Sequence, residues 1–254
     1  MKSIQHIKKY YNEYYTNKLE PLFKKTLILQ AFKPYENDKR QGKWLSKQMQ
    51  IKGDEKILEC GCGVGGVMKQ LALLHPKLEV HGVNISDGQL DIAKEVLKDL
   101  DNCYLSNQNF MNTSYEDNTF DIVYFCESMG YGNFKKAVKE AARILKPNGK
   151  LYINEVVIKC DKDKLSKKEL DKLNNFIDSW FYNIYDIKTI LRKVEEVGGF
   201  SLIEKSRFSK PSVYWINAVR KSGLKKYHGA KLSKIPPTRA VSYTHLTLPT
   251  IYSV

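Results

Sequence analysis

Residues 57 to 66 read Ile57-Leu58-Glu59-Cys60-Gly61-Cys62-Gly63-Val64-Gly65-Gly66. A short apolar run ends in an acid, and the chain then passes through alternating glycines into an amphipathic segment. This order predicts a buried strand, a tight loop that exposes its backbone, and the start of a helix. In doubly wound α/β domains nucleotide-like cofactors bind at such a loop, because glycines let the ligand approach the backbone amides.

The acid before the glycines separates two classes of ligand. Gly61, Gly63 and Gly66 satisfy G-x-G-x-x-G, a pattern of dinucleotide sites that also occurs in glycine turns without a ligand. A carboxylate at Glu59 would repel a pyrophosphate but attract a cationic amino group. The E-x-G-x-G-x-G pattern that ends at Gly65 resembles the first motif of the class I S-adenosylmethionine-dependent methyltransferases. The resemblance implies S-adenosyl-L-methionine as the cofactor, with its amino group held by Glu59.

Strand and helix patterns alternate along the middle of the chain. This alternation predicts an α/β fold with a doubly wound, mostly parallel sheet, and the resemblance implies a Rossmann-like methyltransferase fold. The seven predicted strands span residues 56–60, 78–83, 103–106, 120–126, 150–157, 200–208 and 212–220. The predicted crossover helices span residues 64–74, 87–100, 134–145 and 184–197.

The chain length favours one domain with an appended lid. Residues 1–52 read as an N-terminal helical lid segment. Residues 53–220 form the predicted S-adenosylmethionine-binding methyltransferase domain, with an inserted helix at 161–185 over the active site. A basic C-terminal extension follows at 221–239, where positive charge is densest.

Composition narrows the class of protein. The five cysteines are scattered as in a protein with reduced core thiols, and no metal site is predicted, because the Cys-x-Cys at Cys60 and Cys62 has no His or Cys partner at ligand spacing. No apolar run approaches a membrane span and no signal peptide pattern precedes the first helix, so we expect a soluble, cytoplasmic protein. The net charge of +14 fits a nucleic-acid or anionic-lipid partner, but an AT-rich genome would also produce it.

The last fifteen residues differ from the rest of the chain. Charged residues vanish from Ala240 to Val254, and this tail resembles translated sequencing-adapter read-through. We therefore predict that residues 240–254 are non-native, and the fold prediction leaves them out.

Ligands of such sheets bind at the carboxyl ends of the strands. The second predicted strand ends at Asn84, where the family usually has an acid that accepts both ribose hydroxyls. An amide can accept from one hydroxyl and donate to the other oxygen, although an Asn chosen for a turn is the competing interpretation. The resemblance of the block Gly82–Gln89 to the family implies that Ile85 and Gln89 also line the cofactor site.

Two further segments match the family in order and spacing. Asn109 and Phe110 resemble its adenine-binding segment, which implies that the Asn109 oxygen accepts from the adenine amino group and that Phe110 shapes the pocket. Arg143–Leu151 resembles the family's helix-to-strand turn, in which Pro147 ends the helix and Gly149 permits the reversal. The resemblance thus covers Lys56 to Leu151.

The methyl acceptor is predicted from the end of the fourth strand. Cys126–Tyr131 is neither the Asn/Asp-Pro-Pro-Phe/Tyr loop nor the Pro-Cys motif of nucleic-acid base methyltransferases. Gly82–Gln89 and Glu127-Ser128 resemble instead the C-methyltransferases that alkylate isoprenoid, sterol or lipid double bonds, and Asn183-Ile184-Tyr185 fits the geranyl-diphosphate type. The resemblance implies a small-molecule acceptor, apolar or isoprenoid.

Alkylation of a double bond needs particular surroundings. An alkene that attacks a sulfonium methyl group leaves a carbocation, which aromatic faces and one carboxylate can stabilise when water is excluded. Glu127 and Tyr14 are the predicted catalytic residues. The lid segments also supply aromatic residues, which ordinary packing would equally explain: Tyr10, Tyr11, Tyr15, Trp180, Phe181, Tyr182 and Tyr185.

Two other functions remain open from the sequence. An RNA methyltransferase could hold phosphates with the basic N-terminal segment and Arg220–Arg239, but no RNA-binding module or base-flipping loop accompanies them. A non-catalytic binding protein could keep the same fold and glycine loop. Nucleic acid is therefore a less favoured partner than a small molecule.

Overall fold

A computed structural model of the protein describes residues 4–12, 27–28, 37–158, 162–200, 204–208, 226–227, 230–231 and 241–249. Tyr14 and Tyr15, the predicted strand at 212–220 and most of the basic extension at 221–239 lie outside these residues. Within the extension the structure describes only a two-stranded antiparallel sheet of β8 (Lys226–Tyr227) and β9 (Ala230–Lys231).

A parallel sheet in the order β3-β2-β1-β4-β5 forms the centre of the protein and confirms the predicted α/β fold. Two more strands, β10 and β7, continue the sheet beyond β5, and the short strand β6 pairs with the end of β5. The bounds are β1 (Lys56–Cys60), β2 (Glu79–Asn84), β3 (Cys103–Asn107), β4 (Phe120–Cys126), β5 (Leu145–Ile158), β6 (Tyr185–Asp186), β7 (Glu204–Phe208) and β10 (Val241–Pro249).

Among the described residues the sheet has eight strands, seven in one path and β6 paired beside β5, so the predicted count of seven is not confirmed. Tyr185–Asp186 forms a strand where the sequence predicted the start of a helix at Ile184. The helix begins later, because Asp186 is its N-cap and the Asp186 side chain accepts from the Thr189 amide at 2.9 Å. The predicted turn within Arg143–Leu151 becomes an irregular part of β5, in which Asn148 has φ +64°.

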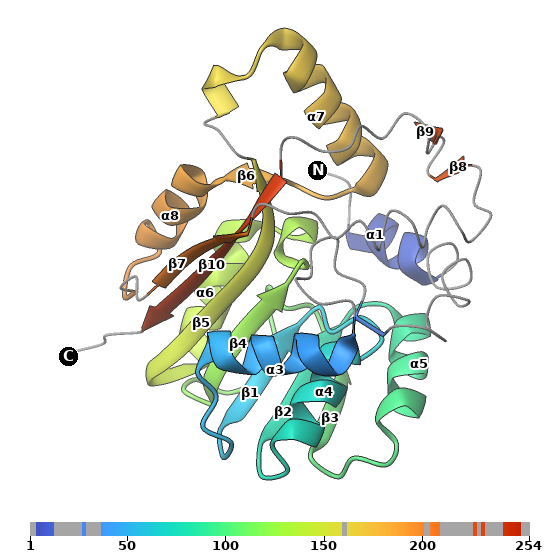
Figure 1. The fold of residues 1–254 in the computed structure, drawn as a ribbon, viewed down its shortest axis with the longest axis vertical. Helices are drawn as coiled ribbons and strands as arrows, with labels where there is room; N and C mark the ends of the chain where they lie inside the picture. The colour runs from blue at the N-terminus through green and yellow to red at the C-terminus, as the bar shows by residue number, and fades with distance from the viewer. Residues whose placement is uncertain are drawn as a thin grey trace.

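Helices cover both faces of the sheet (Figure 1). Their bounds are α1 (Ile4–Tyr10), α3 (Asp38–Met49), α4 (Gly66–Leu74), α5 (Asp87–Leu97), α6 (Phe134–Ile144), α7 (Lys167–Trp180) and α8 (Ile187–Glu195), with single 3-10 turns η2 (Met129–Tyr131) and η3 (Lys162–Lys164). Asn and Ser side chains cap several of them: Asn37 on α3, Ser86 on α5 and Asn133 on α6.

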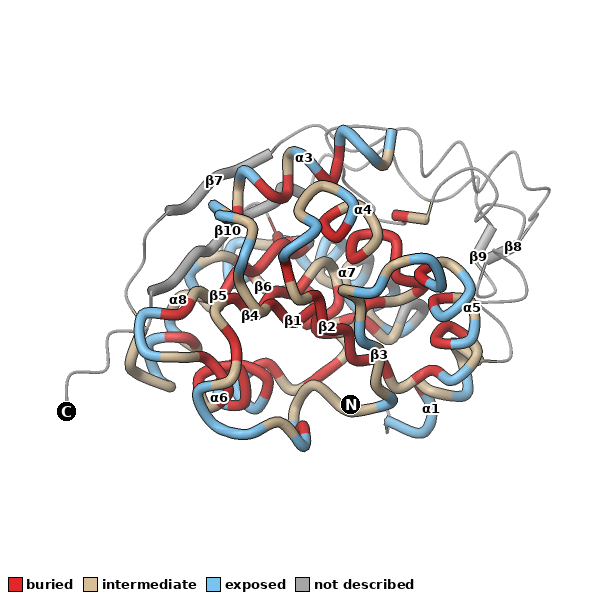
Figure 2. The backbone as a smooth tube through the Cα atoms, turned by 90° about the horizontal axis from the view of Figure 1, so that it is seen from below, coloured by how far each residue is buried: buried red, intermediate tan, exposed pale blue. Residues whose placement is uncertain are grey.

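Two apolar clusters pack the helices against the two faces of the sheet. One packs α3, α4 and α5 against the sheet through residues such as Leu45, Met68 and Leu90. The other packs α6 and α8 against the opposite face through residues such as Val138 and Ile190. Figure 2 shows the buried strands β1, β4 and β5 running between these layers. Burial on both faces explains why β4 is apolar apart from Asp121 near its start.

The two described helices of the predicted lid segment lie in different parts of the protein. α3 packs on α4, and its Leu45 and Met49 are fully buried, so it belongs to a core layer. α1 lies at the start of α5, where the Lys8 ammonium is 2.8 Å from the Asp87 carboxylate. Of the predicted inserted helix, the structure describes η3 and α7, and α7 lies beyond the carboxyl end of the sheet (Figure 1).

Part of the chain end predicted to be non-native is paired in the sheet. β10 lies antiparallel between β5 and β7, with nine residue pairs to β5 and five to β7. The foreign origin of residues 240–254 stays a prediction.

We expect deletion of residues 240–254 to leave the melting midpoint unchanged. When β10 is deleted, another extended segment could pair with β5 in its position. Ser212–Arg220 is a candidate for this segment, because the sequence predicts a strand there. A thermal melt of the chain ending at Arg239 makes the measurement. A drop of several degrees, on the order of 1 kcal/mol for a domain of this size, would show that β10 is required.

Candidate functional site

The glycine loop lies where the sequence predicted it, between β1 and α4. The amides of Gly61 and Cys62 both donate to the Val83 carbonyl, at 2.8 and 3.1 Å, which fixes the loop to the end of β2. Gly63 has φ +56°, and a Cβ placed there would meet nothing within 4 Å. The backbone is therefore approachable from this side, which is the requirement for a cofactor cradle.

Glu59 is buried beneath this loop. Its carboxylate accepts from the Tyr124 hydroxyl at 3.1 Å and from the Met68 amide. Burial raises the pKa of Glu59 to about 8, although both hydrogen bonds act in the opposite direction. Glu59 therefore carries a proton at neutral pH unless a cation comes near. Burial likewise raises the pKa values of the Cys60 and Cys62 thiols well above the usual range, so both stay neutral.

Asn84 braces the glycine loop from the end of β2. Its amide nitrogen donates to the Gly63 carbonyl at 3.3 Å and to the Gln89 side chain at 2.9 Å, while its oxygen accepts from the Ser86 amide at 3.1 Å. Both amide hydrogens are used, and one acceptor position remains. The structure therefore brings Asn84 and Gln89 to the loop, with half-buried Ile85 between them. Their contacts with ribose stay a prediction.

The predicted adenine segment forms a tight turn after β3. The Asn109 side-chain oxygen accepts from the Met111 amide at 3.0 Å, a local contact that shapes the turn. Phe110 packs edge-to-face on Phe125 with ring centroids 5.5 Å apart, and its ring lies against Gly132. An adenine contact stays a prediction for both residues.

The segment after β4, residues 127–131, lies against the glycine loop. A Cβ on Gly61 would lie 2.6 Å from the Cβ of Ser128, and the Ser128 hydroxyl donates to the Cys60 carbonyl. Glu127 is half-buried and adopts a left-handed conformation with φ +53°, which is uncommon for a residue other than glycine. Its amide donates to the Asn154 carbonyl at 2.8 Å. The structure thus places Glu127 next to the predicted cofactor site.

Five aromatic residues form an aromatic cluster at this segment: Tyr10, Tyr11, Tyr131, Phe181 and Tyr182. Edge-to-face contacts join them in a chain, with ring centroids 5.4 Å apart for Tyr10–Phe181, 5.2 Å for Tyr10–Tyr11, 5.3 Å for Tyr11–Tyr131 and 4.7 Å for Tyr131–Tyr182. The cluster joins α1 to η2 and to the linker after α7. Burial raises the pKa of Tyr131, so its hydroxyl stays neutral.

Other predicted site residues lie elsewhere. Tyr185 packs on Phe134, away from the aromatic cluster. Tyr14 and Tyr15 lie outside the described residues, and so does the side chain of Trp180. Among described residues no group of three or more His, Cys, Asp or Glu side chains could hold a metal ion. No described helix has the length and hydropathy to cross a bilayer.

The sequence did not indicate three residues at this site: Tyr131, Asn154 and Glu155. Asn154 is fully buried, and neither polar atom of its side chain has a hydrogen-bond partner. Glu155 is 4% exposed and accepts hydrogen bonds from the amides of Ser128 and Met129. Asn154 and Glu155 lie inside the predicted fifth strand, and two polar residues in a row within a strand were the signal that this position does more than pack.

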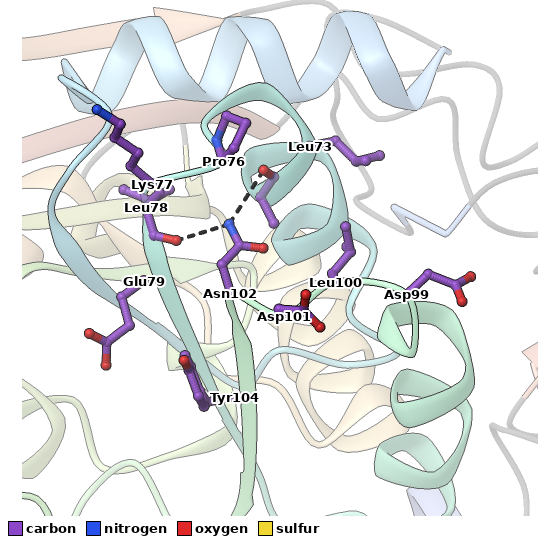
Figure 3. A pocket seen from close by; sticks show the side chains of 11 residues that line it. Leu73, Pro76, Lys77, Leu78, Glu79, Asp99, Leu100, Asp101, Asn102 and Tyr104 are labelled. Atoms are coloured by element: carbon purple, nitrogen blue, oxygen red, sulfur yellow. Dashed lines mark hydrogen bonds between the residues drawn. The ribbon is translucent and has the colours of Figure 1, made fainter.

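A cavity of about 500 Å³ lies at the opposite edge of the sheet. It is lined by the starts of β2 and β3 and the ends of α4 and α5, including Leu78 and Asn102 (Figure 3). The Asn102 amide donates to the Leu78 carbonyl at 2.9 Å, so this polar group already has a partner inside the protein. The glycine loop does not line this cavity, which is separate from the candidate site.

Comparisons with known proteins agree with this geometry. Residues 58–153 match the family described as "Methyltransferase domain". The sterol 4-C-methyltransferase strm-1 of Caenorhabditis elegans is 30% identical over 135 residues, which are 52% of this chain and 40% of that protein. An uncharacterized protein of Methanocaldococcus jannaschii is also 30% identical, over 68% of this chain and 67% of its own length. The chain spans less than half the length of the curated sterol methyltransferases it matches.

A solved structure has the same fold. The geranyl diphosphate C-methyltransferase of Streptomyces coelicolor superposes with a TM-score of 0.74 over 97% of both chains, at 15% identity.

Proposed function

Since this chain belongs to the class I S-adenosylmethionine-dependent methyltransferases, we propose that it uses S-adenosyl-L-methionine to methylate a small apolar acceptor of the isoprenoid, sterol or lipid class. The observation that carries the proposal is the contact between the glycine loop and residues 127–131. Ser128 contacts Gly61 and Cys60, and the residues on either side of this contact include a carboxylate, Glu127, and Tyr131 of the aromatic cluster.

The residues present fit the cofactor. The open side of Gly63 leaves room for a ligand against the loop backbone, and the buried carboxyl of Glu59 is a partner for an amino group. Asn84 keeps one acceptor position for a ribose hydroxyl. When bound, S-adenosyl-L-methionine supplies an electrophilic methyl group.

The acceptor side must stabilise positive charge. An alkene that takes up a methyl group becomes a carbocation until it loses a proton. Aromatic faces stabilise such a cation while excluding water, and the aromatic cluster supplies them. Glu127 is the carboxylate that steadies the cation or accepts the final proton. The resemblance to sterol methyltransferases and the fold of a geranyl diphosphate methyltransferase support an acceptor of this class.

Two experiments test the function. Calorimetry should detect binding of S-adenosylhomocysteine and no binding of NAD. Methyl transfer from labelled cofactor is then measured with prenyl diphosphates, sterols, lipids and RNA. Binding of NAD without binding of S-adenosylhomocysteine would overturn the proposal. Transfer to RNA alone would favour the RNA methyltransferase, whose basic stretch Arg220–Arg239 lies almost entirely outside the described residues.

Binding of S-adenosylhomocysteine at pH 7 is expected to release a proton, because a carboxyl with pKa near 8 is mostly protonated before an ammonium group arrives. For the same reason the affinity should rise as the pH rises toward 8. Calorimetry in buffers of different ionisation enthalpy measures the released proton. Glu59→Gln should abolish the release, and release that persists in this variant would show that Glu59 is not its source.

A further inference from the structure

Glu155, on β5, is a buried carboxylate that joins three segments of the candidate site. Its Oε1 accepts from the amide of Ser128 at 2.8 Å and from that of Met129 at 2.6 Å. Its Oε2 accepts from the hydroxyl of Tyr182. Both oxygens of this buried carboxylate therefore accept hydrogen bonds, and such charge-assisted contacts hold the groups that donate them.

Two of the three donors fix the turn that carries Glu127. Ser128 and Met129 directly follow this residue, and the Glu127 amide itself donates to the Asn154 carbonyl at 2.8 Å. Three consecutive amides therefore bind two consecutive residues of β5. A left-handed conformation at a non-glycine residue has a cost and persists only where the surroundings impose it. Here β5 imposes it.

The third donor joins this turn to the linker after α7. The Tyr182 ring lies against Gly130, where an added Cβ would be 2.6 Å from the ring. Asn183 donates twice to the Gly130 carbonyl, from its backbone at 2.9 Å and from its side chain at 3.0 Å. These contacts hold the linker against residues 127–131.

Ser128 continues the connection to the glycine loop, because its hydroxyl donates to the Cys60 carbonyl and its Cβ faces Gly61. A path of direct contacts thus runs from the linker after α7 through Glu155 and the turn at Glu127 to the cofactor loop.

We propose that Glu155 is a positioning residue: it holds the Glu127 carboxylate at the acceptor and fastens the α7 linker, through Tyr182, over the same site. The inference rests on the proposed function for its effect on turnover. The other part of the proposal, that Glu155 fixes the turn at residues 127–129, does not depend on which acceptor is methylated.

The first measurement needs no acceptor. Amide hydrogen exchange at Ser128 and Met129 should become faster by about tenfold or more in Glu155→Gln, because both amides donate to Oε1 and a neutral amide oxygen accepts more weakly than a carboxylate oxygen. Tyr182→Phe, which removes only one donor from the carboxylate, should give a smaller increase. Tyr115→Phe is the matched control: Tyr115 is a partly buried tyrosine whose side chain also makes a hydrogen bond, but to His81 of β2, at 3.3 Å. Unchanged exchange in Glu155→Gln would overturn the proposal.

The second measurement is a double-mutant cycle on turnover with the acceptor found in the screen. Glu155→Gln alone should lower turnover by about a hundredfold, the loss expected from a displacement of roughly 1 Å, with S-adenosylhomocysteine affinity changed less than about threefold. In the Glu127→Gln background the same change should have almost no further effect, because the group that Glu155 positions is already removed. Additive losses would show a merely structural role and overturn the proposal.

Tyr182→Phe covers the case in which Glu155→Gln does not fold. It should raise the acceptor KM while leaving cofactor affinity unchanged, because only the fastening of the linker is lost. An unchanged acceptor KM would refute the role of the linker. Faster exchange at Ser128 and Met129 in a protein that methylates none of the acceptors would refute the proposed function and support the positioning role.

Discussion

Replacing Gly63 with valine is expected to abolish detectable binding of S-adenosylhomocysteine. Two effects act together. The backbone at φ +56° lies in a region that β-branched residues avoid, and the new side chain would project into the open space that the cofactor must occupy. Calorimetry at ligand concentrations well above the wild-type Kd makes the measurement.

Gly198 provides the matched control for this substitution. It has φ +79°, and a Cβ there would also meet nothing within 4 Å, but it follows α8 and is remote from the glycine loop. Gly198→Val should therefore lower the melting midpoint by backbone strain while leaving the affinity for S-adenosylhomocysteine unchanged. Binding that survives in Gly63→Val would mean that the cofactor does not approach this face of the loop.

Glu127→Gln is expected to lower turnover by roughly a hundredfold or more while barely changing cofactor affinity. Glutamine has the same length and tolerates the same backbone conformation, so the substitution removes the charge and the base while keeping the shape. A carboxylate that steadies a cation acts mainly in the transition state, and its loss therefore appears in turnover and not in binding. Single-turnover measurements with saturating cofactor separate the two.

An exposed acid is the control for this effect. Glu95 lies on α5 with a side chain that is 78% exposed, so Glu95→Gln should leave turnover unchanged. Unaltered turnover in Glu127→Gln would remove this residue from the mechanism and leave catalysis to proximity and alignment.

The parallel core of the fold could be predicted from the sequence because local patterns determine it. The apolar run Phe120–Cys126 has the same bounds in the sequence prediction and in the structure, and the helices after β1 and β2 begin within two residues of their predicted starts. The far edge of the sheet was harder to predict. Tyr185–Asp186 is too short for any periodicity, and pairing between strands distant in sequence leaves no local pattern.

The site was predicted in part. The glycine loop, Asn84 and Glu127 follow from their positions at strand ends, since that edge of a parallel sheet faces the ligand. The competing interpretation of Asn84 as a turn residue gains support, because its side chain binds Gly63, Ser86 and Gln89 within the protein. The role of Glu155 could not be predicted, because it depends on Tyr182, a residue 27 positions away that only the tertiary fold brings near.

The place of α1 connects the two parts of the candidate site. In the segment that starts with α1, Asn12 accepts from the Ser86 hydroxyl at 2.7 Å, at the N-cap of α5, and Tyr11 packs on Tyr131 in the aromatic cluster. Under the proposed function, one short segment would therefore contact the surroundings of both the cofactor and the acceptor. We expect a substitution that displaces this segment to weaken the binding of both.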